Sequence, residues 1–256
     1  MLFAKLLKTL LLSSAFLLVS VGCQAAAFNA TGYDSHVELQ CIELCKAEQK
    51  YQLKVSINDG AWQNRGEFQG QSQLDFTRDL GRNLTLRYQL LSADQKEVLA
   101  SAQTQTRDFS DDELLEMVQR YTFRYFWDHA DPITGWAKER MPNPRDGDII
   151  TSGGTGFGIA ALITASERGW VSREAAVDRM LKITAASQQL ERFHGMWAHW
   201  YNPATGKVHN FSKYDDGGDI VESAFLMQGL LTARQYFNQA TAKEQQLRQD
   251  ISRLWH

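Results

Sequence analysis

Four carboxylates gather beside an apolar stretch in the last quarter of the sequence. Asp215, Asp216, Asp219 and Glu222 lie at the start of a predicted helix that continues to Tyr236. Because Asp215, Asp219 and Glu222 are spaced by four and three residues, a helix through them would place all three on one face. Carboxylates that lead into a buried helix are typical of a lined cavity, where they serve as general acids and bases.

Helix capping is the simpler interpretation of the same acids. Asp and Glu are favoured at helix N-termini, where they accept hydrogen bonds from free N–H groups and meet the positive end of the dipole. Three acids in register exceed that need, particularly beside Gly217-Gly218 and ahead of Phe225, Leu226 and Gly229, which we expect to be buried. This stretch alone leaves both interpretations open.

A predicted loop at residues 191–216 carries aromatic and histidine side chains ahead of the acids. Trp197 and Trp200 are costly to expose unless they pack under the loop or bind an apolar surface such as the face of a sugar. His194 and His199 are five residues apart, which is not the spacing of a helical metal site. We therefore predict no metal.

The glycine-rich run Ser152–Gly158 does not fit a nucleotide site. Only Ile149-Ile150 precede it, too little for a buried strand, and its glycines do not match G-x-G-x-x-G. The sequence also lacks a phosphate-binding P-loop, a G-x-S-x-G nucleophile motif and an HExxH zinc motif. We predict no cofactor, and we expect the glycines to let this helix approach its neighbours closely.

Composition bounds the class of protein. The 256 residues carry a net charge of −3, which gives no basic field for nucleic acid. The hydrophobic fraction of 43% and the charged fraction of 22% are ordinary for a globular protein.

The first residues have the pattern of an export signal. Two lysines precede the apolar run Leu10–Val21, which is too short for a membrane span and ends in small residues before Cys23. This end resembles a bacterial lipobox, with Ser20 in place of the more usual Leu. We predict a signal peptide at 1–22 and a lipid on Cys23, which would be the only membrane attachment. Gln24 rather than Asp after the cysteine favours an outer-membrane or periplasmic location.

After a linker at residues 23–32, residues 33–107 alternate in polarity with the period of strands. Their pattern fits a small β-sandwich and resembles a fibronectin type III domain, for which a spacer role is the simplest function. Cys41 and Cys45 could bridge across a turn but not along one strand, so we expect a local disulfide or two buried thiols.

Near Arg107–Ser110 the hydrophobic period changes to that of a helix. Ser110 begins a predicted capping box, and further helices are expected at 156–168, at 172–190 with Ser172 as the cap, after the acids, and from 242 onward. Long loops at 131–154 and 191–216 alternate with a short connection. This rhythm suits a barrel of helical hairpins, with an ordinary helical bundle as the alternative.

Five motifs in this order closely resemble the glycoamylase-like domain family, which includes bacterial endo-β-1,2-glucanases. The motifs are TFRYFWD (122–128), GWAKER (135–140), TSGGTGFG (151–158), RFHGMWAHW (192–200) and DDGGDIVE (215–222). The resemblance covers residues 110–256 and implies a small β-sandwich followed by an incomplete (α/α)6 barrel that acts on glucan, with β-1,2-glucan the expected substrate.

The resemblance also implies roles for the acids. The glucanases invert the anomeric carbon, which needs a general acid and a general base about 6.5–9.5 Å apart. Asp215, Asp219 and Glu222 match the family's acidic pocket and are the expected catalytic residues. Glu222, between Val221 and Phe225, is expected to be the most buried and therefore the general acid, because burial favours a neutral carboxyl. Asp215 is expected to stay ionised.

The residues expected to bind the sugar are Arg140, Trp197, His199, Trp200 and Asp216. A full barrel needs twelve helices and only about five are predicted, so we expect a second catalytic carboxylate beyond residue 256 and an inactive fragment. Two other functions stay open: a non-catalytic glycan-binding lipoprotein of the envelope, and a structural envelope protein.

Overall fold

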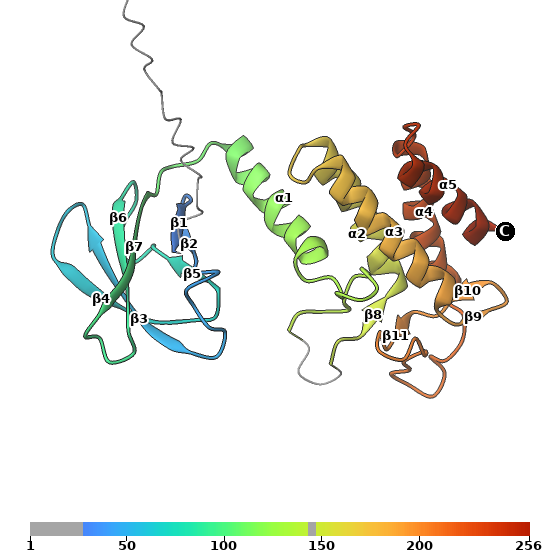
Figure 1. Cartoon of the computed structure of the whole chain (residues 1–256), viewed down its shortest axis with the longest axis horizontal. Helices are drawn as coiled ribbons and strands as arrows, with labels where there is room; N and C mark the ends of the chain where they lie inside the picture. The colour runs from blue at the N-terminus through green and yellow to red at the C-terminus, as the bar shows by residue number, and fades with distance from the viewer. Residues whose placement is uncertain (1–27, 143–146) are drawn as a thin grey trace, which may run out of the picture. The chain divides into compact units, whose positions relative to one another are not determined.

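The computed structural model of the chain describes residues 28–142 and 147–256. These residues belong to two compact units, one ending at Ser110 and the other beginning at Asp111 (Figure 1). The predicted signal peptide, the lipidation site Cys23 and the first half of the predicted linker lie outside the described residues. Within the described ranges, no helix is both long and apolar enough to span a membrane.

The described part of the N-terminal unit contains seven antiparallel strands in two sheets, with the orders β1-β2-β5 and β4-β3-β6-β7. The strands are β1 (Asn29–Gly32), β2 (His36–Gln40), β3 (Lys50–Ile57), β4 (Trp62–Gln69), β5 (Ser72–Phe76), β6 (Thr85–Leu91) and β7 (Val98–Gln105). Side chains from both sheets share one apolar core. The unit is therefore a sandwich of two sheets.

The strand alternation predicted from the sequence appears directly in this core. Leu53 and Val55 of β3 are buried, as are Leu86, Tyr88 and Leu90 of β6, while the residues that alternate with them are more exposed. Alternate side chains point to opposite faces of a strand, so one face of each strand fills the space between the sheets.

A disulfide joins Cys41 and Cys45 just after β2. Of the two alternatives left open by the sequence, the local bridge is the one the structure contains. Both cysteines are buried in the core of the sandwich.

The described part of the C-terminal unit contains five α-helices (Figure 1). They are α1 (Asp111–Trp127), α2 (Ser152–Glu167), α3 (Arg173–Gln189), α4 (Ile220–Tyr236) and α5 (Ala242–Trp255). The predicted cap of α3 is confirmed, because Ser172 accepts a hydrogen bond from the Ala175 amide at 3.1 Å. The predicted start of α2 at Gly156 is wrong: the helix begins at Ser152, whose amide donates to the His199 carbonyl.

Helices α2 and α4 pack closely at two glycines. A Cβ atom added at Gly156 would lie 2.2 Å from the Phe225 carbonyl oxygen, and one added at Gly229 would lie 2.5 Å from the Gly156 carbonyl oxygen. A side chain at either position would therefore push the helices apart. The expectation that glycines in this run permit close helix packing is confirmed at Gly156.

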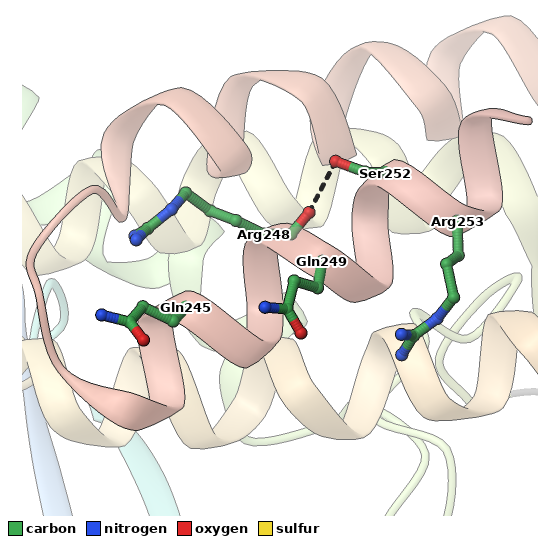
Figure 2. A pocket seen from close by; sticks show the side chains of 5 residues that line it. All are labelled: Gln245, Arg248, Gln249, Ser252 and Arg253. Carbon is green, nitrogen blue, oxygen red and sulfur yellow. Dashed lines mark hydrogen bonds between the residues drawn. The ribbon is translucent and has the colours of Figure 1, made fainter.

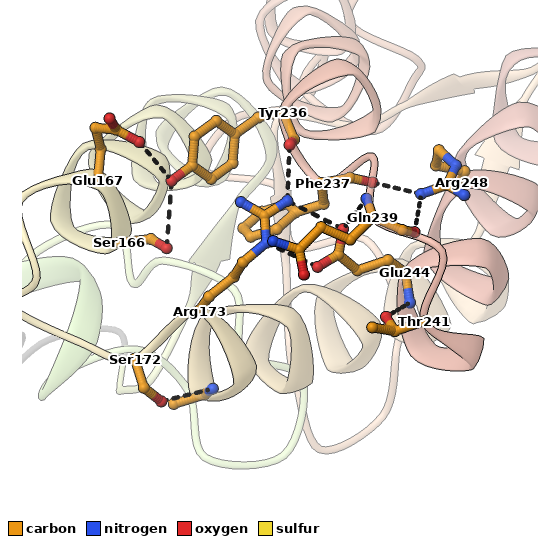
Figure 3. A network of polar contacts seen from close by, with 11 residues as sticks. Ser166, Glu167, Ser172, Arg173, Tyr236, Phe237, Gln239, Thr241, Glu244 and Arg248 are labelled. Atoms are coloured by element: carbon orange, nitrogen blue, oxygen red, sulfur yellow. Dashed lines mark hydrogen bonds and ion pairs between the residues drawn. The ribbon is translucent and has the colours of Figure 1, made fainter.

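Helix α3 packs against α5, and a polar network joins α3 to the turn between α4 and α5 (Figure 3). The guanidinium of Arg173 donates to both oxygens of Glu244, at 2.8 and 3.0 Å, and to the Tyr236 carbonyl at 2.9 Å. Arg248 donates to the Phe237 carbonyl at 2.7 Å. These bonds satisfy backbone carbonyls left free where α4 ends.

The two long loops form short antiparallel pairs. The pairs are β8 (Ile150–Thr151) with β11 (Trp200–Tyr201), and β9 (Arg192–Phe193) with β10 (Met196–Trp197). The β8–β11 pair ties the loop before α2 to the loop before α4. Residues from both loops consequently lie side by side at the N-terminal ends of these two helices.

Candidate functional site

Helix α4 begins at Ile220, so Asp219 is its N-cap. Asp219 Oδ1 accepts hydrogen bonds from the amides of Val221 and Glu222, at 2.9 and 3.0 Å. Asp215 lies in the preceding loop, and the prediction that it shares a helical face with the other acids is wrong. The capping interpretation is correct for Asp219, but capping engages only one of its two carboxylate oxygens.

His199 lies between the other oxygen of Asp219 and the carboxylate of Glu222. Its Nδ1 atom is 3.5 Å from Asp219 Oδ2, and its Nε2 atom is 3.6 Å from Glu222 Oε2. A protonated imidazole here would form ion pairs with both acids. The structure thus brings together two predicted catalytic carboxylates and a residue predicted to bind the sugar.

Burial of Glu222 comes from α2 rather than from its neighbours on α4. Its side chain is 18% exposed, whereas Val221 is 56% exposed and Phe225 is 43% exposed. The expectation that Phe225 is buried is therefore wrong, although Leu226 is fully buried. A Cβ atom added at Gly153 of α2 would lie 1.9 Å from Glu222 Oε2, so the carboxylate occupies the space that this glycine leaves.

A cavity of about 300 Å³ lies beside this group. It is lined by His199, Trp200, Tyr214, Asp215, Gly217, Gly218, Asp219 and Ile220. Asp215 thus faces the same hollow as Asp219, although it is not on the helix. Asp216 is not among the residues that line it.

Trp200 lies against His199 at the wall of the cavity. The two rings are stacked, with centroids 3.6 Å apart and planes 10° from parallel. Phe211 contacts Trp200 edge to face at 4.8 Å. The indole is partly exposed and lines the cavity, and its contact with a sugar stays a prediction.

Trp197 is a core residue instead. It is 2% exposed, and its indole N–H donates to the Ser187 carbonyl at 3.0 Å. The predicted contact between this ring and a sugar is wrong for this structure, and the packing alternative is correct. The sequence does not separate Trp197 from Trp200 because strand pairing and helix packing determine which ring turns inward.

Residues 197–199 are fixed by a serine at the start of each neighbouring helix. Ser152 Oγ of α2 donates to the Ala198 carbonyl at 2.9 Å. Ser223 Oγ of α4 donates to the Trp197 carbonyl at 3.1 Å and accepts from the Trp197 amide at 2.8 Å. The backbone just before His199 is consequently held by a serine side chain from each helix.

Sequence reasoning missed Glu139 as a residue of this site. The indole N–H of Trp200 donates to Glu139 Oε2 at 2.9 Å, and Arg140 donates to Glu139 Oε1 at 3.4 Å. Arg140, predicted to bind the sugar, is 57% exposed on its side chain and is not among the residues that line the cavity. Burial raises the pKa of Tyr125, and the nearby Glu139 charge adds to that shift.

Two other hollows in the described part of the unit lack carboxylates. One of about 710 Å³ lies along α4 and α5 near Met227 and Trp255. The other, of about 590 Å³, follows one face of α5 and is lined by Gln245, Arg248, Gln249, Ser252 and Arg253 (Figure 2). Acid–base chemistry therefore points to the cavity beside His199.

Across residues 28–142 and 147–256, no cluster of three or more Cys, His, Asp and Glu side chains is arranged to bind a metal ion.

No protein-family model matches the sequence. The chain is 37% identical over 242 residues to an exo β-1,2-glucooligosaccharide sophorohydrolase (non-reducing end) of Parabacteroides distasonis, a match that covers 88% of this chain and 32% of the relative.

Solved structures give a similar result. A crystal structure of a β-1,2-glucanase from Parabacteroides distasonis matches with a TM-score of 0.74 and 34% identity, over 90% of this chain and 33% of that one. An endo-β-1,2-glucanase from Chitinophaga pinensis, in complex with sophorotriose and glucose, matches with a TM-score of 0.56 and 44% identity, over 58% of this chain and 37% of that one. The chain thus spans about a third of the length of these relatives.

Proposed function

We propose that this chain is part of a glycoside hydrolase that acts on β-1,2-glucan. The observation that carries the proposal is the 37% identity over 242 residues to a β-1,2-glucooligosaccharide hydrolase. The geometry supports it, because Asp215, Asp219, His199 and Trp200 line one cavity, and His199 also contacts Glu222.

We propose an inverting mechanism for these acids. An inverting enzyme needs room for a water molecule between the general acid and the general base. His199 contacts both Asp219 and Glu222, and the cavity beside it offers the room for sugar and water. We assign the general acid to Glu222, the less exposed of the two. Asp215 or Asp219, both at the cavity wall, would orient or deprotonate the water.

Sugar contacts would come from the rim of the same cavity. The ring of Trp200 offers an apolar face to sugar C–H groups, while the Asp215 carboxylate accepts hydrogen bonds from hydroxyls. Tyr214, 83% exposed, lines the cavity from the loop before α4. Arg140 and Asp216 remain predicted sugar contacts, reached by a chain longer than the cavity.

We also infer that the helices belong to an (α/α)6 barrel. Packing of α2 on α4 and of α3 on α5 supports this, because alternate helices of such a barrel lie side by side in an inner and an outer ring. The three-plus-four arrangement of strands supports a fibronectin type III-like module ahead of it. An exported lipoprotein of the periplasm or outer membrane, attached through Cys23, completes the proposal.

The test is an assay of the complete gene product on linear β-1,2-glucan, measured as release of reducing sugar. We expect turnover by the natural protein and its loss in Glu222→Gln. Saturable binding of the glucan without turnover would overturn the hydrolase proposal in favour of a glycan-binding protein. Full activity of Glu222→Gln would overturn the assignment of the acid.

A further inference from the structure

Glu139 connects to the acid pair through two aromatic rings. Its Oε2 atom accepts the indole N–H of Trp200 at 2.9 Å, and the indole is stacked on His199 at 3.6 Å. His199 in turn contacts Asp219 and Glu222 through its two nitrogens. A carboxylate outside the cavity is thus linked to both acids beside it.

The backbone brings Glu139 and Trp200 together. Strand β8 pairs with Trp200–Tyr201 through β11 and also forms a bridge between Ile150 and Lys138. The Glu139 amide donates to the Ile149 carbonyl at 2.8 Å. Glu139 and Trp200 therefore belong to segments on either side of β8, where long side chains can meet across it.

We propose that Glu139 is a positioning residue that orients His199 between Asp219 and Glu222 by fixing the indole of Trp200. The effect on turnover rests on the proposed hydrolase function, whereas the effect on the His199 ring does not. No carboxylate other than Glu139 accepts the Trp200 N–H among the described residues.

Physical considerations favour this role. A hydrogen bond to an ionised acceptor is stronger than one between neutral groups. One such bond sets the rotation of a large flat ring, and an imidazole stacked on that ring loses freedom to tilt. Without the bond, the indole keeps its edge contact with Phe211 but loses the polar contact that fixes its N–H edge. The imidazole would then move relative to both acids.

The primary test follows the His199 ring by NMR in the full chain. A proton above an indole face is shifted upfield, so the His199 Hε1 signal, assigned by its absence in His199→Gln, reports the stack. We expect the upfield shift to be reduced in Glu139→Ala, which removes the acceptor and leaves the indole itself in place. We expect it to be retained in Glu139→Gln, because the amide oxygen can still accept.

Glu116 provides a matched control. It accepts the indole N–H of Trp170 at the same 2.9 Å distance, but it lies on α1 away from the cavity. Glu116→Ala should leave the His199 signal unchanged. An unchanged His199 signal in Glu139→Ala would overturn the proposal.

Kinetics of the complete gene product on β-1,2-glucan provide the second readout. Misplacement of reacting groups by about 1 Å can cost up to about 100-fold in rate, so we expect kcat to fall by 10- to 100-fold in Glu139→Ala with little change in KM. Glu139→Gln should recover most of that loss. A raised KM with unchanged kcat would overturn the proposal, because it would make Glu139 a support for sugar binding. Absence of turnover in the natural protein would overturn the hydrolase proposal, while the NMR result would still decide the role of Glu139.

Discussion

The Nδ1 atom of His199 lies 3.5 Å from Oδ2 of Asp219, and the other oxygen of Asp219 caps helix α4. One carboxylate therefore serves both the stability of the helix and the geometry of the site. These two roles can be separated, because Asn caps a helix about as well as Asp but carries no charge.

Replacing Asp219 by Asn should separate the two roles. We expect the free energy of unfolding to change by less than about 0.5 kcal/mol, because the amide oxygen still accepts from the α4 amides. We expect glucan hydrolysis by the complete gene product to fall on the order of 100-fold or more, because the acid–base contribution of the carboxylate is lost. Urea unfolding and reducing-sugar assays measure the two effects.

The control for this prediction is another helix cap. Thr241→Ala removes the side chain that accepts the Glu244 amide at 3.2 Å at the start of α5. It should lower the free energy of unfolding by about 1 kcal/mol without a matching loss of turnover. Unchanged turnover in Asp219→Asn would show that Asp219 only caps the helix.

Two glycines of α2 should differ in whether their substitution lowers turnover or stability. Gly153→Ala places a methyl group 1.9 Å from Glu222 Oε2, the end of a flexible side chain that can move. We expect unfolding free energy to change by less than about 1 kcal/mol. Turnover should fall by up to about 100-fold as the carboxylate is displaced.

Gly156→Ala is the matched variant three residues along the same helix. Its methyl group would meet the Phe225 carbonyl at 2.2 Å, and backbone cannot move aside without separating α2 from α4. Overpacking of this kind costs about 1–3 kcal/mol. Equal losses of stability in the Gly153 and Gly156 variants would contradict the assigned environments.

The sequence predicted local features well where local chemistry decides them. The alternation predicted across residues 33–107 is found at Leu53 and Val55, which are buried, and the predicted cap Ser172 accepts a hydrogen bond from a nearby amide. The close helix contact at Gly156 followed from the size of the side chain.

Features decided by distant contacts were not predictable. Helix α4 begins at Ile220 rather than near Asp215, since the Asp219 amide donates to the Trp197 carbonyl and ends the helical hydrogen-bond pattern there. Glu139 was missed because its contact with Trp200 depends on strand pairs of two residues each, which are too short to leave a periodic pattern.

The two tryptophans of the loop before α4 should differ in their effect on stability. Trp197→Ala removes a ring that is 2% exposed and should cost about 3–5 kcal/mol in unfolding free energy. Trp200→Ala removes a partly exposed ring and should cost less, while it lowers glucan affinity. Urea denaturation and isothermal titration with β-1,2-glucooligosaccharide measure these effects. The assignment of Trp197 to the core fails if the Trp197→Ala variant is as stable as the Trp200→Ala variant or more stable.

Acid should weaken the C-terminal unit through Glu244. Its side chain is 3% exposed, and its hydrogen bonds with Arg173 are the main reason that its pKa is lowered (Figure 3). Because the folded pKa lies below that of an unfolded glutamate, about 4.3, the stabilisation is fully present above that pH. It is lost as the pH falls through the lowered pKa.

The pH dependence is measured as a difference between the natural chain and Glu244→Gln. At neutral pH the variant should be less stable, because Arg173 loses a charged acceptor. The difference in unfolding free energy should narrow as the pH falls below about 4.3, because Glu244 of the natural chain then takes up a proton and loses the charge that the variant lacks. Glu174→Gln, at a side chain 78% exposed, is the control and should show little difference at any pH. A difference for Glu244→Gln that stays constant down to acidic pH would show that its ionisation does not stabilise the fold, because ionisation is the property that acid removes.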